Sequence, residues 1–158
     1  MATTVIINTK NESQKNIVYA LLRLTYSHSF PNGNSGYDRG ELKAHEQALA
    51  PHGVNFNKIQ AGNAHIPATV EISFAENANI PAIKQYILSL LRERVENNKN
   101  EWWFDAHNIL RNLEIGEKSH RLSLKIGDYT FDAEYFDLKS PLYQKKRDEF
   151  LSVLDTLS

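Results

Sequence analysis

The chain has 158 residues, of which 41% are hydrophobic and 23% are charged, enough for one globular domain with a core of ordinary size. It contains no cysteine, which excludes disulfides, thiolate nucleophiles and cysteine-based metal sites. The formal net charge is −1, so no overall basic field attracts nucleic acid. We expect a single domain over residues 1–158 that needs no cofactor.

No segment resembles a signal peptide or a membrane anchor. The N-terminus lacks a basic region before its short apolar run, Val5–Ile7, and no later run approaches the roughly 20 apolar residues that span a bilayer. We therefore expect an unexported cytoplasmic protein. The one cluster of three basic residues, Lys145–Arg147, is typical of a solvated helix face.

The first elements in chain order are a strand and a helix. Thr3–Asn8 is rich in β-branched residues, and its three successive apolar side chains predict a well-buried strand. Either Asn11 or Ser13 can cap the helix that follows. The apolar stripe of this helix consists of Ile17, Ala20, Leu21 and Leu24.

A polar, glycine-rich segment from Phe30 to Gly40 predicts a long loop and a candidate functional surface. Glu41–Leu49 is typical of a short helix that ends before Pro51. Residues 54–67 show no regular pattern and are predicted to be irregular.

The middle of the chain contains a strand and the clearest helix. Ala68–Ala75 alternates between apolar and polar residues, which predicts a half-buried strand. Asn79 can cap a helix with Pro81 in its first turn. Its apolar stripe comprises Ile80, Ile83, Ile87, Leu90, Leu91 and Val95.

A hairpin is predicted around the turn Gly127-Asp128, with Ile126 opposite Tyr129. This register gives one apolar face and one polar face. The apolar-side pairs are Leu124 with Phe131, Leu122 with Ala133 and His120 with Tyr135; the others are Lys125 with Thr130, Ser123 with Asp132 and Arg121 with Glu134.

A C-terminal helix begins near Pro141. The complete order predicts an α+β fold with a partly antiparallel sheet, a C-terminal hairpin and helices packed mainly on one face.

Two enzyme-like patterns fail on simple tests. Asp128 and Asp137 resemble the acids of a metal-dependent nuclease, with Lys139 as a third element, but a continuous strand would separate the acids by roughly 30 Å. Arg39 and His45 have a spacing found in some ribonucleases, a spacing that chance alone explains. His45 and His52 lack a fixed third metal ligand, so we expect no metal site.

Both tryptophans lie in the segment Glu101–His107, for which two models remain open. If Asn98 caps a helix, Trp102 and Trp103 join its apolar face with Ala106, Ile109, Leu110 and Leu113, and Phe104 projects nearly opposite. If the segment is extended and Asp105 caps the helix, Trp103 points away from Trp102 and Phe104. Either model leaves one large ring off the core face.

These features favour a non-catalytic protein that binds another protein, and within that class a toxin-neutralising immunity or inhibitor protein of bacterial type. The alternative is an enzyme or binder of nucleic acid, which would use an active site of unfamiliar kind around Asp38, Arg39 and His45. The predicted interface residues are Tyr37, Asp38, Arg39, Trp103, Phe104, Asp132 and Glu134.

Overall fold

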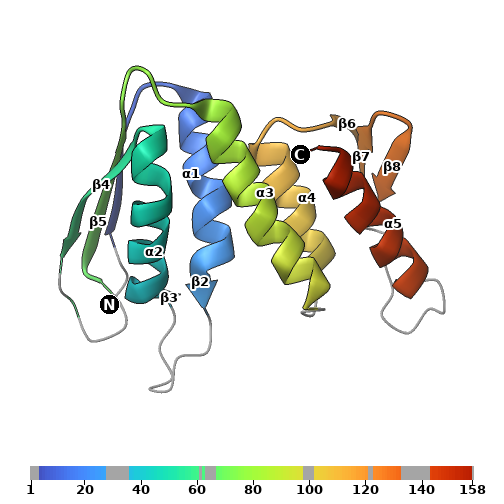
Figure 1. Cartoon of the computed structure of the whole chain (residues 1–158), viewed down its shortest axis with the longest axis horizontal. Helices are drawn as coiled ribbons and strands as arrows, with labels where there is room; N and C mark the ends of the chain where they lie inside the picture. The colour runs from blue at the N-terminus through green and yellow to red at the C-terminus, as the bar shows by residue number, and fades with distance from the viewer. Residues whose placement is uncertain are drawn as a thin grey trace. The chain divides into compact units, whose positions relative to one another are not determined.

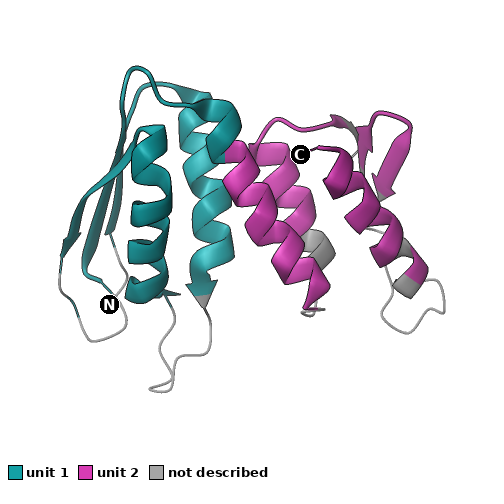
Figure 2. Ribbon diagram, in the orientation of Figure 1, with its two compact units in different colours: residues 1–83 teal, residues 84–158 magenta. Residues whose placement is uncertain are grey.

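The computed structural model describes residues 4–27, 36–60, 62, 67–97, 102–120, 123–132 and 143–157. The chain divides into two compact units, residues 1–83 and 84–158, which Figure 2 colours teal and magenta. Each unit contains a three-stranded sheet and helices of its own. That residues 1–158 form one domain stays a prediction.

Unit 1 is built on a mixed sheet with the strand order β1-β5-β4. Strand β1 runs parallel to β5, whereas β4 runs antiparallel to it. The elements of unit 1 are β1 (Thr4–Asn8), α1 (Glu12–Thr25), β2 (Tyr26–Ser27), β3 (Gly36–Tyr37), α2 (Arg39–Leu49), the 3₁₀ turn η1 (Ala50–His52), β4 (Val54–Gln60) and β5 (Thr69–Phe74).

Helices α1 and α2 lie on the same side of this sheet (Figure 1). The predicted cap of α1 is Asn11, whose side chain accepts a hydrogen bond from the backbone N–H of Gln14 at 3.2 Å. The predicted stripe of α1 is buried throughout. On the sheet, Val70 and Ile72 of the central strand β5 are fully buried, which places the core of unit 1 between sheet and helices.

Strand β1 is less buried than its sequence predicts, and for its outer face the prediction is wrong. Val5 and Ile7 are half-buried, but Thr4, Ile6 and Asn8 are exposed, and Ile6 keeps 41% of its surface accessible. The pleat of a strand directs alternate side chains to opposite faces. Because the described helices of unit 1 cover only one face of this sheet, every second residue of β1 points away from the core.

Strand β4 occupies a segment that the sequence predicts to be irregular. Its pairing with β5 shifts register between Phe56 and Lys58, so that Asn57 is the extra residue of a β-bulge. Val54 and Phe56 are buried before the bulge, and Ile59 is half-buried after it. The bulge moves the inward positions from even to odd numbers, which removes the simple alternation that reveals a strand.

A glycine joins η1 to β4. Gly53 has a φ of 90°, and a Cβ atom there would lie 2.8 Å from the Cα of Ala78. The residue before Gly53 is hydrogen-bonded to the same segment as Ala78, because the N–H of Asn79 donates to the carbonyl of His52 at 2.8 Å. Only glycine meets both the dihedral angle and the close approach.

Unit 2 contains most of α3, which begins in the last four residues of unit 1. Its elements are α3 (Ile80–Glu96), α4 (Trp102–Asn112), β6 (Glu117–His120), β7 (Ser123–Ile126), β8 (Tyr129–Asp132) and α5 (Tyr143–Thr156). Asn79 caps α3 as predicted, accepting from the N–H of Ala82 at 3.2 Å. The core of unit 2 is apolar and includes Ile87, Leu91, Val95, Ile109, Leu110, Leu113, Leu124, Phe131, Phe150 and Leu154.

The predicted hairpin register is confirmed over all four described pairs, from Ile126 opposite Tyr129 to Ser123 opposite Asp132. Gly127 has a φ of 59°, as a type II′ turn requires at its first central residue. The aromatic ring of Phe131 packs against that of Phe150 in α5, with 4.9 Å between centroids.

The predicted pairing of His120 with Tyr135, at the end of the hairpin far from the turn, is wrong. His120 does not continue the hairpin strand toward Tyr135, because it belongs to β6, which runs antiparallel to β7 and places His120 opposite Ser123. The chain therefore reverses between His120 and Ser123, and the sheet order is β6-β7-β8. The predicted pairs that involve Arg121, Leu122 and residues 133–135 lie outside the described residues.

The fold is α+β, as predicted: five α-helices accompany a mixed sheet and an antiparallel C-terminal hairpin in the described residues. In this part of the chain no helix combines the length and apolar character needed to cross a membrane.

Candidate functional site

The predicted interface residues are divided between the two units. Tyr37, Asp38 and Arg39 follow one another in unit 1, where β3 ends and α2 begins. Trp103, Phe104, Asp132 and Glu134 belong to unit 2. The three consecutive residues are called here the Tyr37–Arg39 site. Among the predicted interface residues, they are the ones whose side chains the structure describes.

Tyr37 is held by a second tyrosine. Strands β2 and β3 pair so that Tyr26 lies opposite Tyr37, and their rings meet edge to face with centroids 5.3 Å apart. Burial, with a smaller effect of Tyr26, raises the pKa of Tyr37 above its usual range. The phenol therefore stays protonated at neutral pH and can donate a hydrogen bond. The segment around Tyr37, predicted to be loop, is strand at this point.

Asp38 has a structural task that the interface prediction missed. Its Oδ1 accepts a hydrogen bond from the backbone N–H of Glu41 at 2.9 Å, which makes it the N-cap of α2. Helix α2 consequently begins at Arg39, two residues before the predicted start. The sequence did contain a signal, since an Asp followed three residues later by a Glu is a typical beginning of a helix.

Arg39 occupies the first helical position of α2 and is partly exposed. Its Nε and Nη2 atoms are buried, and no described residue accepts a hydrogen bond from either of them. Neither of these two atoms therefore has a carboxylate partner in the described part of the chain.

His45 lies in the core of unit 1. It is only 6% exposed, and its Nε2 lies 3.0 Å from Oγ1 of Thr25. The Thr25 hydroxyl donates to the carbonyl of Leu21 at 3.0 Å, so its oxygen accepts the proton of Nε2. Burial lowers the pKa of His45 below 6.5. His45 is therefore a neutral histidine that joins α1 to α2.

The aromatic segment is helical from Trp102 onward, so the extended model with Asp105 as the cap is wrong. Ala106, Ile109, Leu110 and Leu113 are buried, as the helical model predicts. The side chains of residues 102–105 lie outside the described part of the chain, and the outward direction of Phe104 stays a prediction. One turn beyond Phe104, His107 is 2% exposed, so the buried arc of α4 is wider than predicted.

The two acidic residues of the predicted interface are Asp132 and Glu134. Asp132 ends β8 opposite Ser123, and its side chain is outside the described part of the chain. Glu134 is not among the described residues. Nearer the turn, burial raises the pKa of Tyr129 to about 12, and the charge of Glu149 in α5 adds to the shift.

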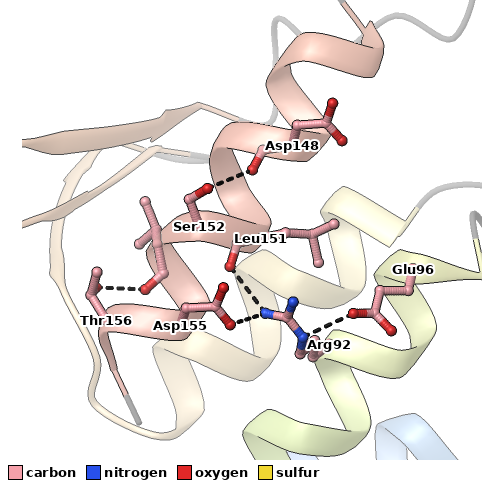
Figure 3. Close-up of polar contacts among 8 residues, drawn as sticks. Arg92, Glu96, Asp148, Leu151, Ser152, Asp155 and Thr156 are labelled. Atoms are coloured by element: carbon pink, nitrogen blue, oxygen red, sulfur yellow. Dashed lines mark hydrogen bonds and ion pairs between the residues drawn. The ribbon is translucent and has the colours of Figure 1, made fainter.

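Sequence reasoning also missed a polar cluster in unit 2, drawn in Figure 3. Arg92 of α3 forms ion pairs with Glu96 of the same helix, at 2.9 Å, and with Asp155 of α5. Its Nη1 donates to the carbonyl of Leu151 at 3.2 Å. A cation at the last turns of α5 also suits the helix dipole. No periodic pattern predicts the contacts between α3 and α5, because Leu151 and Asp155 lie 59 and 63 residues after Arg92.

The described residues contain no group of three His, Asp or Glu side chains placed to hold a metal ion. Comparison with known proteins adds no further assignment: the chain matches no protein-family model, no curated protein and no solved structure. The site must therefore be judged on its own chemistry.

Proposed function

We propose that this chain is a non-catalytic protein that binds another protein, and within that class a toxin-neutralising immunity or inhibitor protein. The observation that carries the proposal is Arg39, a partly exposed residue two positions after Tyr37 whose Nε and Nη2 atoms have no hydrogen-bond acceptor among the described residues. Tyrosine and arginine are the residue types, with tryptophan, that dominate the binding energy of protein interfaces. The Tyr37–Arg39 site would thus meet an acidic group of the partner.

The ordered local structure at these residues favours binding. Tyr37 is fixed by its strand pairing and by the ring of Tyr26. Arg39 begins a helix whose start is fixed by the Asp38 cap. Side chains that are already ordered lose less conformational entropy when a partner binds. A carboxylate on the partner would accept charge-assisted hydrogen bonds from Arg39.

The nucleic-acid alternative has less support from the same residues. An enzyme that used His45 as a general base would need this ring within hydrogen-bond reach of a substrate. His45 is instead buried and bonded to Thr25. Six positions on a helix also turn by about 240°, which puts Arg39 and His45 on different faces of α2.

Two assays separate the two functions. The first is calorimetric titration of the full chain with the product of the adjacent reading frame, for which we expect nanomolar binding. The second is incubation with RNA and DNA at several salt concentrations, for which we expect neither cleavage nor salt-dependent binding. Nuclease activity that His45→Ala abolishes, without binding to the neighbouring product, would overturn the proposal.

A further inference from the structure

The outer edge of β1 in unit 1 has backbone groups with which no described strand pairs. Among the described residues, β5 is the only strand that pairs with β1. The side of Thr4–Asn8 that faces away from β5 is called here the β1 edge. Ile6, on the uncovered face of this strand, is one of two large hydrophobic side chains that the described residues expose, the other being Tyr19.

Of the two edge strands of this sheet, β4 has features that oppose further pairing and β1 does not. Strand β4 contains the bulge at Asn57, followed by the charged Lys58, and both features oppose the addition of another strand. Strand β1, with the sequence Thr-Val-Ile-Ile-Asn, has no charge, no proline and no register shift. It is the β1 edge that is built to accept a further strand.

The backbone groups that face this edge can be identified from the register. The N–H of Thr4 donates to the carbonyl of Ala68 at 3.0 Å, so even-numbered residues of β1 bond toward β5. The N–H and C=O groups of Val5 and Ile7 therefore point to the open edge. The carbonyl of Ile7 also accepts from the N–H of Thr9 at 3.1 Å, and its second lone pair remains available.

We propose that a second copy of this chain pairs with β1 in antiparallel orientation, about a two-fold axis that passes beside Ile6. Val5 then lies opposite Ile7 of the other copy, so that each outward N–H meets an outward carbonyl. Ile6 lies opposite its own counterpart, in the closer, non-hydrogen-bonded type of pair. Thr4 lies opposite Asn8, and all five residues of β1 find a partner.

The side chains suit this arrangement as well as the backbone does. Cross-strand pairs of β-branched residues stabilise antiparallel sheets, and the pairing supplies two Val–Ile contacts and one Ile–Ile contact. No charged residue of β1 faces a like charge, because the strand has none. The exposed face of Ile6 is covered by the same face of its counterpart, as an isologous interface requires.

Cysteine cross-linking tests both the dimer and its register. The chain has no cysteine of its own, so any disulfide must involve the introduced residue. In the proposed register the Cα atoms at position 6 of the two copies are about 4.5 Å apart, within the range that a disulfide spans. Positions 8 of the two copies are separated by four residues of strand, or roughly 14 Å.

We expect oxidised Ile6→Cys to form a covalent dimer in high yield and Asn8→Cys to stay monomeric. A mixture of Thr4→Cys and Asn8→Cys should give the mixed dimer. Cross-linking of Asn8→Cys to itself, or none by Ile6→Cys, would overturn the register.

Sedimentation equilibrium of the full chain tests whether the pairing occurs without a covalent link. A contact of five residues is small, so we expect a weak dimer that dissociates on dilution. Ile6→Lys places two like charges opposite each other and should abolish the dimer, while circular dichroism stays unchanged because Ile6 is exposed. Tyr19→Lys, the matched change on α1, should dimerise like the wild type. A monomer at about 1 mM, or equal loss in both variants, would refute the proposal.

Discussion

At the scale of single residues, Asp38 combines a place in the candidate site with the cap of α2. Asp38→Ala removes the acceptor for the N–H of Glu41 and should lower the free energy of unfolding by about 1 kcal/mol. Asp38→Asn keeps the acceptor and should lose much less. Urea unfolding followed by circular dichroism measures both variants. Equal losses would mean that the charge of Asp38, and not its hydrogen bond, supports the helix.

His45 should make stability depend on pH in a defined direction. Burial lowers its pKa below 6.5 in the folded chain, so between that lowered value and 6.5 the unfolded chain binds the extra proton. The free energy of unfolding should therefore fall as the pH drops through this range, and its contribution should be complete above pH 6.5. Urea unfolding at pH 7.5 and at lower pH, in wild type and His45→Gln, measures the effect.

The chain contains five other histidines, so the informative quantity is the difference between the two proteins. We expect the wild type to lose more stability than His45→Gln as the pH falls. A pH dependence that is the same in both would show that His45 is already able to accept a proton in the folded chain.

At the scale of elements, the junction between η1 and β4 depends on Gly53. Gly53→Ala must adopt a positive φ and also bring its Cβ to 2.8 Å from the backbone of Ala78. Gly127→Ala in the hairpin turn has a positive φ but no atom within 4 Å of its Cβ. We expect about 1–2 kcal/mol of destabilisation at Gly127 and a further 1–3 kcal/mol at Gly53.

Thermal and urea unfolding of the two glycine variants test this difference. If Gly127→Ala were as destabilising as Gly53→Ala, the steric contact with Ala78 would have no measurable cost, and the dihedral angle alone would explain both positions.

The elements that the sequence predicts well are those with an unbroken period. The stripe of α3, the face of α4 and the hairpin around Gly127 each repeat at one fixed spacing. Four members of the α3 stripe and four of the α4 face are buried, and the four described hairpin pairs nearest the turn are confirmed. The failures occur where a local feature breaks the repeat. The bulge at Asn57 hides β4, and the reversal after His120 makes β6 appear to be a continuation of β7.

The candidate site was predictable only in part, for a related reason. Tyr37, Asp38 and Arg39 could be selected by residue type, and the cap formed by Asp38 is a local contact, but the ring that packs on Tyr37 comes from another element. The ring of Tyr26 is eleven residues away from Tyr37, and Thr25 is twenty residues away from His45. A periodic pattern shows which face of an element is buried, and it does not show which residue of another element lies there.

At the scale of the whole molecule, two surfaces of unit 1 have separate proposed roles. The Tyr37–Arg39 site offers tyrosine and arginine to an acidic partner, whereas the β1 edge offers backbone groups and Ile6 to a second copy. The proposals are independent, because Ile6→Lys should abolish self-association without weakening the partner, and Arg39→Ala should do the reverse.

The most direct test of the central claim is the affinity of Arg39→Ala for the product of the adjacent reading frame, measured by calorimetric titration. Arg111→Ala is the matched control, because Arg111 is an exposed arginine of α4 outside the site. We predict that Arg39→Ala weakens binding by at least about tenfold, equivalent to about 1.4 kcal/mol, and that Arg111→Ala binds like the wild type. Tight binding that Arg39→Ala leaves unchanged would contradict the account.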